Sequence, residues 1–446
     1  MGKLKLWMVL VLMAAWSIPM MGLSGTASGE DLRSDLNQAK KEIQELRNEL
    51  AELKEDSSWT YNQELRTSLA KVPAASQGSA GGALKLPAGW SIELGGFFKF
   101  DMAYDDSAIS SGDFIRWVNS EDSDTDNDDQ INFTARQSRF GAKIFAPDIG
   151  DVKVMGRLEI DFYNLSGGQE NKSSPLLRHA YGQLTGPEWS LIFGQTSDLI
   201  SPLVPNTVNY TVGWWGGNIG YRHPQLRFTK WWTFQERCTL KVETALSRDI
   251  GGDSSDFGSV EEGQDASAPT VLSRVSFSAP CAGKKLEAGV SGHWGLEEYD
   301  WDYVGDDDRI CTWSVNADLV VPLGDMLEFK GEFFLGENLD SYLGGIGQGV
   351  NTSEREAIES VGGWLQLGLK PNEKWAFHVG TGMDNPRDCD LPSGARSSNC
   401  FVFGNANYNF TKYLSTALEL TYWNTSYIDD SSGDDFRIQH AWKLSF

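Results

Sequence analysis

The chain has 446 residues and a formal net charge of −24, and it is rich in glycine (47) and tryptophan (17). So acidic a chain is a poor partner for nucleic acid, whose phosphates are also negative. Mean hydropathy is −0.36, and beyond the first residues no window is apolar enough for a membrane-spanning helix. Any membrane span must therefore be built from β-strands.

Residues 1–27 have the features of a secretory signal peptide. Lys3 and Lys5 precede an apolar run over residues 6–15, and the small residues up to Ala27 offer a cleavage site. The run is about half the ~20 residues that a membrane-spanning helix needs. A cleaved export signal is therefore favoured over a retained anchor.

Residues 30–56 predict a coiled coil that joins chains. Apolar residues recur at alternating spacings of four and three, with acidic residues at g and basic residues at e, which suits a parallel, in-register assembly. A helix packed on its own domain usually has a wider apolar face. The pattern does not distinguish a dimer from a trimer. Residues 57–89, which follow the coiled coil, are rich in Ala, Ser and Gly and are predicted to be a linker. The seam consists of Leu32, Leu36, Ala39, Ile43, Leu46, Leu50 and Leu53.

Residues 90–446 predict an all-β transmembrane barrel of about sixteen antiparallel strands. Short connections rich in turn formers alternate with long ones, so short and long connections sort onto opposite ends, as in outer-membrane barrels with short periplasmic turns. A soluble β-sandwich gives no reason for this alternation. The expected strands are 90–104, 131–146, 151–163, 174–186, 187–195, 221–233, 236–247, 270–279, 285–298, 309–322, 326–337, 358–370, 374–383, 399–410, 413–426 and 435–446.

Alternation within strands predicts which side chains face inward. Between residues 152 and 162, charged side chains alternate with apolar ones, and the closing strand up to Phe446 alternates in the same way. The predicted lumen is charged and of mixed sign, and about sixteen strands leave an aqueous channel. The inward residues of these two strands are Lys153, Arg157, Glu159, Asp161, Arg437, Gln439, Lys443 and Ser445.

The most acidic stretch, residues 105–130, carries nine Asp or Glu and Arg116 as its one base. Such a run is most often a solvated loop. Aspartates at every second position from Asp122 to Asp128 allow a divalent cation beside lipopolysaccharide as a weaker alternative.

Five cysteines in an exported chain permit disulfides. Cys389 and Cys400 flank one loop, which their bridge would close. Cys238 and Cys281 are expected at the same barrel rim, where a second bridge is plausible, and Cys311 would then stay unpaired.

Three stretches, TARQSRFG at 134–141, FGQT at 193–196 and RHPQLRF at 222–228, together with the coiled coil and a terminal Phe446, resemble the DcaP-like porins of Gram-negative bacteria. The resemblance covers essentially the whole chain after the signal, although "RQSR" also occurs in neighbouring porin families. It implies a homotrimer of barrels in the outer membrane, among lipids and lipopolysaccharide, with the coiled coil in the periplasm. The implied function is passive diffusion of small hydrophilic solutes, with dicarboxylic or other anionic compounds preferred in some members.

The resemblance also implies that the loop after the fifth strand, residues 196–220, folds into the pore as a constriction. This loop has one charged residue, Asp198, and so departs from an acidic constriction.

Candidate pore residues are inward basic side chains and polar residues of that loop. Arg139 and Lys143 share a parity opposite to Phe140, and Arg136 joins them only if a β-bulge occurs near Gln137. A ladder of lumenal arginines would favour carboxylates. Two alternatives stay open: the arginines balance inward acids, or the acidic outer loops favour cations at the mouth. Parity does not show whether Arg178, Arg222 and Arg227 face inward. The full set of candidate pore residues is Arg136, Arg139, Lys143, Arg157, Arg178, Asp198, Asn206, Tyr210, Arg222 and Arg227.

The sequence also bears on two other classes of protein, an outer-membrane enzyme and a structural protein. A barrel lipase needs a Ser and a His within hydrogen-bond reach, but none of the five histidines is accompanied by a GxSxG arrangement. No metal spacing or nucleotide fingerprint is evident, so we expect neither an enzyme nor a cofactor. The main alternative is a structural protein whose coiled coil ties the outer membrane to the cell wall.

Overall fold

The computed structural model describes residues 83–446 apart from 124–127, 165–172, 235–236, 249–265 and 302–306. The chain divides into two units, Met1–Gly78 and Ser79–Phe446, and the second is described here by itself. The predicted signal peptide, the coiled coil and residues 57–82 of the linker lie outside the described residues. Within the described part, no helix is long and apolar enough to cross a membrane.

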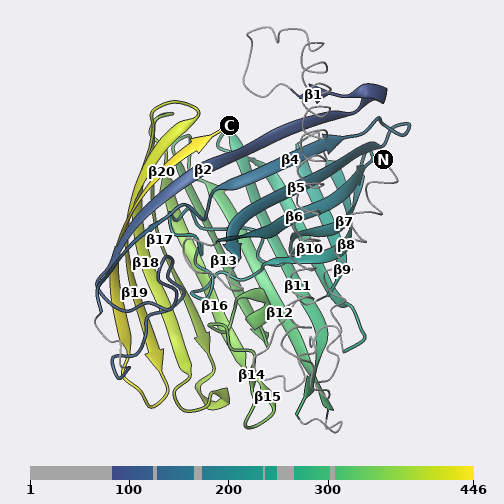
Figure 1. Ribbon diagram of the computed structural model, residues 1–446. Helices are drawn as coiled ribbons and strands as arrows, with labels where there is room; N and C mark the ends of the chain where they lie inside the picture. The colour runs from purple at the N-terminus through teal and green to yellow at the C-terminus, as the bar shows by residue number, and fades with distance from the viewer. Residues whose placement is uncertain (1–82, 124–127, 165–172, 235–236, 249–265, 302–306) are drawn as a thin grey trace, which may run out of the picture. The chain divides into compact units, whose positions relative to one another are not determined.

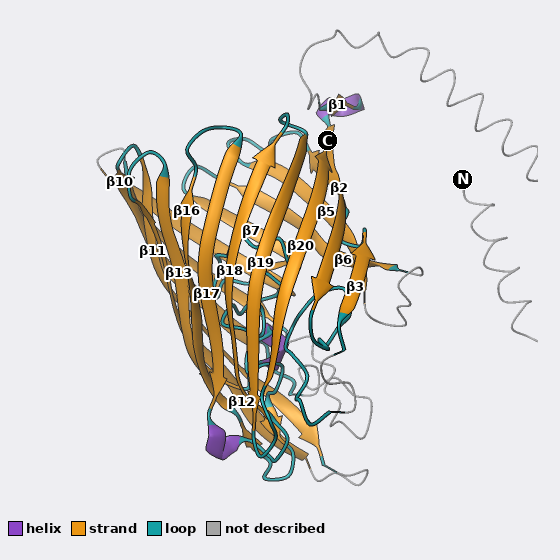
Figure 2. Ribbon diagram, turned by 90° about the vertical axis from the view of Figure 1, so that its left-hand side faces the viewer, coloured by secondary structure: helices purple, strands orange, loops and turns teal. Residues whose placement is uncertain are grey.

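Sixteen antiparallel strands close into a barrel, as the sequence predicted (Figures 1 and 2). Each strand pairs with its neighbour in the chain, and β20 closes the barrel on β2, with Phe98 opposite Leu444. β3 and β4 together form the second barrel strand. The strands are β1 (Leu84–Lys85), β2 (Ser91–Asp105), β3 (Gln130–Thr134), β4 (Arg139–Phe145), β5 (Lys153–Asn164), β6 (Ser174–Thr185), β7 (Trp189–Ser197), β8 (Arg222–Phe234), β9 (Cys238–Ser247), β10 (Thr270–Cys281), β11 (Lys284–Asp300), β12 (Asp307–Pro322), β13 (Leu327–Glu337), β14 (Val350–Asn351), β15 (Glu356–Ala357), β16 (Glu359–Leu369), β17 (Trp375–Pro386), β18 (Arg396–Asn409), β19 (Leu414–Tyr427) and β20 (Gly433–Ser445), and the short 3-10 helices are η1 (Pro87–Gly89), η2 (Asp340–Tyr342) and η3 (Asp388–Asp390).

Short turns lie at one end of the barrel and long connections at the other, which confirms the predicted alternation. The β10–β11 turn consists of Ala282 and Gly283, whose φ angles of 47° and 76° match the two-residue turn that suits the right-handed twist of a hairpin. The chain end at Phe446 lies at the short-turn end, whereas the β14–β15 hairpin lies at the long-loop end (Figure 1).

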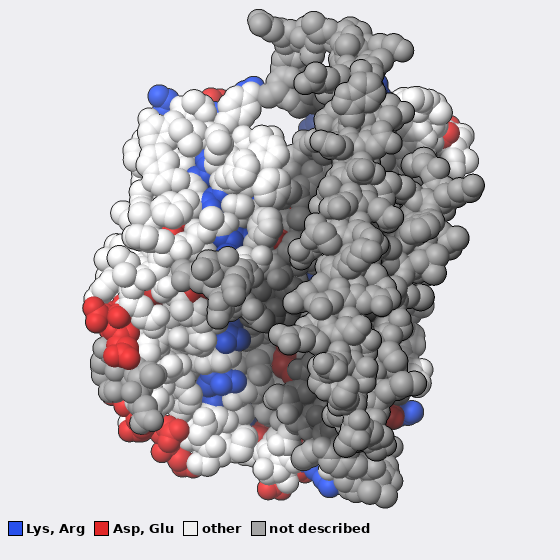
Figure 3. Space-filling view, in the orientation of Figure 1, with Lys and Arg blue, Asp and Glu red and all other residues white. Residues whose placement is uncertain are grey.

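The two faces of the wall differ as predicted. Leu158, Phe333 and Trp442 point outward and are 49%, 52% and 39% exposed. Glu332, next to Phe333, and Arg437, on the same strand as Trp442 but with opposite parity, point inward and are buried. On the face seen in Figure 3, acidic side chains gather toward the long-loop end. Exposed acids of that end include Asp106, Glu121, Asp122, Asp128, Asp129, Asp429, Asp430 and Asp434.

The acidic segment after β2 is solvated only in part. Glu121, Asp122, Asp128 and Asp129 are exposed, as predicted, but the prediction was wrong for residues 107–120. Ile115 and Val118 are fully buried and pack with Phe401, Phe403 and Trp423 on the inner wall. Because these apolar residues lie between the acids, their burial draws residues 107–120 into the barrel. Asp124 and Asp126 of the predicted cation site lie outside the described residues.

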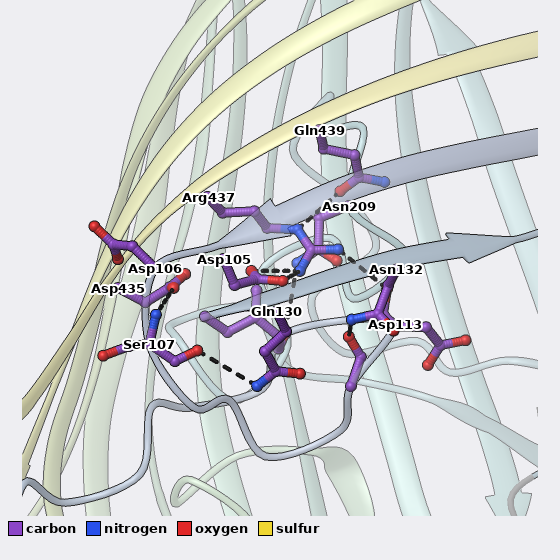
Figure 4. Close-up of polar contacts among 12 residues, drawn as sticks. Asp105, Asp106, Ser107, Asp113, Gln130, Asn132, Asn209, Asp435, Arg437 and Gln439 are labelled. Carbon is purple, nitrogen blue, oxygen red and sulfur yellow. Dashed lines mark hydrogen bonds and ion pairs between the residues drawn. The ribbon is translucent and has the colours of Figure 1, made fainter. Parts of the chain in front are cut away.

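An ion-pair network on the closing strand holds this loop (Figure 4). Nη1 of Arg437 donates to both carboxylate oxygens of Asp105, at 2.7 and 2.9 Å, and Nη2 donates to the carbonyl oxygen of Asp113. Asp435 accepts a hydrogen bond from the amide of Ser107. The closing strand therefore fixes where the loop turns inward.

The five cysteines are free thiols in the structure, so neither predicted bridge is present. Cys400 lies between the buried inward residues Asn399 and Phe401, so its side chain points away from the lumen, whereas Cys389 lies in η3. Cys238 and Cys281 lie at the short-turn end of neighbouring strands, as predicted. Sγ of Cys281 instead contacts the carbonyl oxygen of Pro322.

Candidate functional site

The loop between β7 and β8, residues 198–221, crosses the barrel interior. Its first part packs on the wall through Leu199 and Ile200, which are buried with Leu272 of β10 and Phe334 of β13. Its middle reaches strands on the far side of the barrel. The inward fold of this loop agrees with what the family resemblance implied.

Wall side chains hold the middle of the loop by its backbone. Glu419 of β19 is buried and accepts hydrogen bonds from the amides of Val208 and Asn209, at 2.7 and 3.1 Å. Glu332 of β13 accepts one from the amide of Leu203 at 2.7 Å. Since each carboxylate satisfies amides that the loop cannot pair internally, the wall fixes the loop conformation.

Asn206 is held from two strands. Its amide donates to Gln366 of β16 at 2.6 Å, and its carbonyl oxygen accepts from Asn405 of β18 at 2.7 Å. Asn206 is therefore a structural anchor of the loop.

A close backbone approach locks the far part of the loop. Gly217 has φ +115°, and a Cβ built on it would lie 2.2 Å from the carbonyl oxygen of Gly363 on β16. Only glycine fits both the backbone angle and this distance.

A cavity of about 330 Å³ lies between the loop and the inner wall. Four basic side chains from four strands line it, and the loop closes it with Pro202, Tyr210 and Trp214. The basic residues are Arg139 of β4, Arg178 of β6, Arg222 of β8 and Lys443 of β20.

Two of the four cations are neutralised by inward acids. Arg178 binds Glu159 at 3.0 Å and Asp161 at 2.6 Å, and Arg139 lies 3.9 and 4.0 Å from the same two carboxylates. Arg178 is the extra residue of a bulge in β6, where His179 faces Glu159 and Leu177 faces Ile160. The bulge explains why its parity was ambiguous.

Arg222 is the least satisfied of the four. It is 3% exposed, and its Nε and Nη2 have no hydrogen-bond partner. Its guanidinium stacks on Tyr221, with the guanidinium carbon 4.2 Å from the ring centroid. Among the described residues, no carboxylate oxygen lies within 4.0 Å of Arg222 or of Lys443, whose Nζ lies over the Phe97 ring. The cavity thus carries two cations without a paired acid, and a buried unpaired guanidinium favours an anion.

Two predicted loop residues also line the cavity, the neutral Tyr210 and the acidic Asp198. Tyr210 stacks on Tyr163 with ring centroids 3.8 Å apart, and burial raises its pKa to about 12, so its phenol stays neutral. Asp198 accepts from the amide of Tyr221 and contacts Nδ1 of His223 at 2.9 Å. Burial raises the pKa of Asp198, but the opposing effects of His223 and of the Tyr221 amide are together larger, so the pKa lies below its ordinary value. Asp198 therefore pins the base of the loop.

The bulge near Gln137, which the sequence alone left open, is present. Thr134 faces Asp101 and Arg139 faces Phe97, so the β3–β4 strand holds one more residue than β2 over this stretch. Arg136 does not reach the cavity, however, because it binds Asp113 of the inward loop at 2.9 Å.

Three other predicted residues lie away from the cavity. Lys143 and Arg157 line a separate hollow of about 170 Å³, and Arg157 is paired with Glu159 at 2.7 Å. Arg227 faces inward, but its guanidinium donates hydrogen bonds to the side chain of Gln225 and to the carbonyl oxygen of Ser197. The structure thus brings together five of the ten predicted residues: Arg139, Arg178, Asp198, Tyr210 and Arg222.

The site list from the sequence omitted Lys443 and the anchors Glu332, Gln366 and Glu419. Inward parity on their strands signals that they face the lumen, but it does not reveal which loop they hold. No group of three or more His, Cys, Asp or Glu side chains within the described ranges is placed to bind a metal ion.

Comparison with solved structures identifies the fold. The chain is similar to the crystal structure of the outer membrane channel DcaP of Acinetobacter baumannii, with a TM-score of 0.64 and 23% identity over 82% of this chain and 100% of that one. It is also similar to an anion-selective porin from Comamonas acidovorans (TM-score 0.52, 12% identity, 80% and 100% covered) and to Salmonella typhi OmpF in complex with daunomycin (TM-score 0.52, 12% identity, 81% and 100% covered). No family model and no curated protein matches the chain. The chain therefore has the fold of the sixteen-stranded porins.

Proposed function

We propose that this chain is a porin of the outer membrane of a Gram-negative bacterium, where it forms a water-filled channel for passive diffusion of small hydrophilic solutes. The fold supports the proposal, as does the division of the wall into an apolar outer face and a polar inner face. The folded-in loop 198–221 narrows the channel and sets its selectivity. The assembly is a homotrimer, as the resemblance to DcaP-like porins implies.

The preferred solutes are small carboxylates, dicarboxylates among them. The observation that carries this is Arg222, a buried guanidinium with two unpartnered nitrogens, facing the cavity that Lys443 also lines. A guanidinium binds a carboxylate through two parallel hydrogen bonds, and a dicarboxylate can engage both cations. Of the basic residues that line the cavity, only Arg222 and Lys443 are therefore proposed to attract carboxylates. Arg139 and Arg178 instead balance the charges of inward acids.

Channel formation is tested in planar bilayers with the purified protein. Stepwise conductance increases are expected, and their absence at protein levels that insert into the bilayer would contradict the porin proposal.

Solute preference is tested by liposome swelling with succinate against a neutral sugar of similar size. Succinate is expected to enter faster, and Arg222→Gln is expected to reduce this advantage. Arg227→Gln is the matched control, because Arg227 also faces inward but does not line the cavity. Equal loss in both variants would argue against a specific role for Arg222.

A further inference from the structure

A second group of cations lies at the long-loop end of the lumen, outside the cavity. Arg116 from the loop after β2 and Arg396 at the start of β18 both stack on Trp117, with guanidinium carbons 4.3 and 4.1 Å from the ring centroid. Arg116 also lies 5.6 Å from the centroid of Trp215 in loop 198–221. We call these four residues the Arg–Trp cluster.

The backbone around the Arg–Trp cluster is held firmly. Asn399 is fully buried, and its Nδ2 donates to the carbonyl oxygens of Arg116 at 2.8 Å and Trp215 at 2.7 Å. Gln348 accepts from the amide of Arg396 and donates to its carbonyl oxygen. The cluster is therefore built before any ligand arrives.

The two guanidinium groups are largely unused by the protein. Nε of Arg116 is buried without a partner, and its Nη2 donates to the carbonyl oxygen of Ser110. Nε of Arg396 donates to the carbonyl oxygen of Ile346, which leaves its Nη atoms without a hydrogen bond to the described residues. Across that part of the chain, no carboxylate oxygen lies within 4.0 Å of either group. Two like charges on one indole repel each other, so an anion beside them would be stabilised.

The chemistry of the cluster selects the shape of that anion. Guanidinium forks bind carboxylates, and the faces of guanidinium and indole groups accept flat aromatic rings. The row of rings continues inward, because Trp215 lies 6.4 Å from Trp214, and Trp214 lies 5.6 Å from the guanidinium carbon of Arg222. The edge-to-face contact between Trp215 and Trp214 therefore links the cluster to the cavity that Trp214 lines.

We propose that Arg116, Trp117, Trp215 and Arg396 form a binding site for planar aromatic carboxylates, which captures them at the long-loop end of the lumen. The carboxylate binds the free guanidinium nitrogens and the ring packs against Trp215, because the two guanidinium groups already lie over Trp117. Delivery to the cavity rests on the proposed channel function, whereas binding itself does not.

Isothermal titration calorimetry of the full-length protein in detergent tests the binding. Benzoate and cyclohexanecarboxylate have the same charge and nearly the same size, but only benzoate is flat. Benzoate is expected to bind about fivefold more tightly, as stacking on an indole and a guanidinium adds about 1 kcal/mol. Equal affinities for the two acids would overturn the site.

Variants separate binding from a role in joining the loops. Arg396→Gln is expected to weaken benzoate binding about tenfold, and Arg396→Lys, which keeps the charge but loses the planar fork, to weaken it by a smaller factor. Arg309→Gln is the control, because Arg309 is an exposed arginine paired with Glu298. Benzoate affinity unchanged in Arg396→Gln, in protein whose circular dichroism and heat-modified gel mobility are unaltered, would contradict the proposal.

Bilayer conductance in potassium chloride distinguishes this proposal from the channel function. Benzoate binding by a protein that gives no conductance steps would refute the channel and leave the site standing. Conductance steps without benzoate binding would refute the site alone.

Discussion

Arg437 on the closing strand and Asp105 on β2, 332 positions apart in the chain, form a buried two-oxygen ion pair across the barrel seam, with Nη1 at 2.7 and 2.9 Å from the carboxylate (Figure 4). The pair does two things at once. It joins the last strand to the first, and through the carbonyl oxygen of Asp113 it holds the first long loop inside the lumen.

Replacing Arg437 with Ala is expected to lower the free energy of unfolding by about 3–5 kcal/mol, because Asp105 is left as a buried, unpaired carboxylate. Urea unfolding in detergent measures this change. Arg309→Ala, which breaks an exposed pair with Glu298, should cost about 1 kcal/mol or less. Similar losses of unfolding free energy in the two variants would show that the pair of Arg437 and Asp105 stabilises the barrel no more than an exposed ion pair does.

Replacing Glu419 with Ala is expected to free the middle of loop 198–221, because the amides of Val208 and Asn209 lose their acceptor. The single-channel conductance should rise and become noisier, and Glu419→Gln, which keeps one acceptor oxygen, should change it less. Glu373→Ala in an exposed short turn is the control. A conductance unchanged in Glu419→Ala would show that the loop does not depend on this anchor.

Replacing Gly217 with Ala is expected to displace the same loop, since the new Cβ would lie 2.2 Å from the carbonyl oxygen of Gly363. We expect a loss of about 2–4 kcal/mol in unfolding free energy, of which about 1–2 kcal/mol comes from the positive φ alone. Gly112→Ala isolates that part, because Gly112 also has a positive φ, of +63°, but has open space around it. Equal losses of unfolding free energy in the two variants would show that the contact with Gly363 does not contribute.

Deleting residues 30–56 is expected to reduce the mass of the assembly, because the predicted heptad seam joins chains in parallel. Native mass spectrometry of the full chain and the deletion variant measures the change. The same mass for both would show that the barrels associate without the coiled coil.

The strands were predictable because the signal for each is local. Alternation along β5 placed Arg157, Glu159 and Asp161 inward, and all three side chains meet there in ion pairs or in the hollow beside Lys143. The bulge near Gln137 could be stated only as a condition for Arg136 to face inward, because the sequence does not show the register with β2.

The loops were not predictable in the same way, because their positions depend on partners far away in the chain. Glu419 lies 211 positions from Val208, and neither segment carries a sequence signal that predicts their contact. The acidic charges after β2 predict a solvated loop, yet the burial of Ile115 and Val118 draws residues 107–120 into the barrel. The bulge that turns Arg178 inward likewise needs the register with β5.

The reversal potential across a bilayer in a potassium chloride gradient tests the central claim, that Arg222 and Lys443 make the channel prefer anions. An anion-selective potential is expected for the unaltered protein. In Arg222→Gln with Lys443→Gln, a loss of about 1 kcal/mol of attraction should lower the anion-to-cation permeability ratio about fivefold. A cation-selective potential for the unaltered protein, or a ratio that the double substitution leaves unchanged, would contradict it.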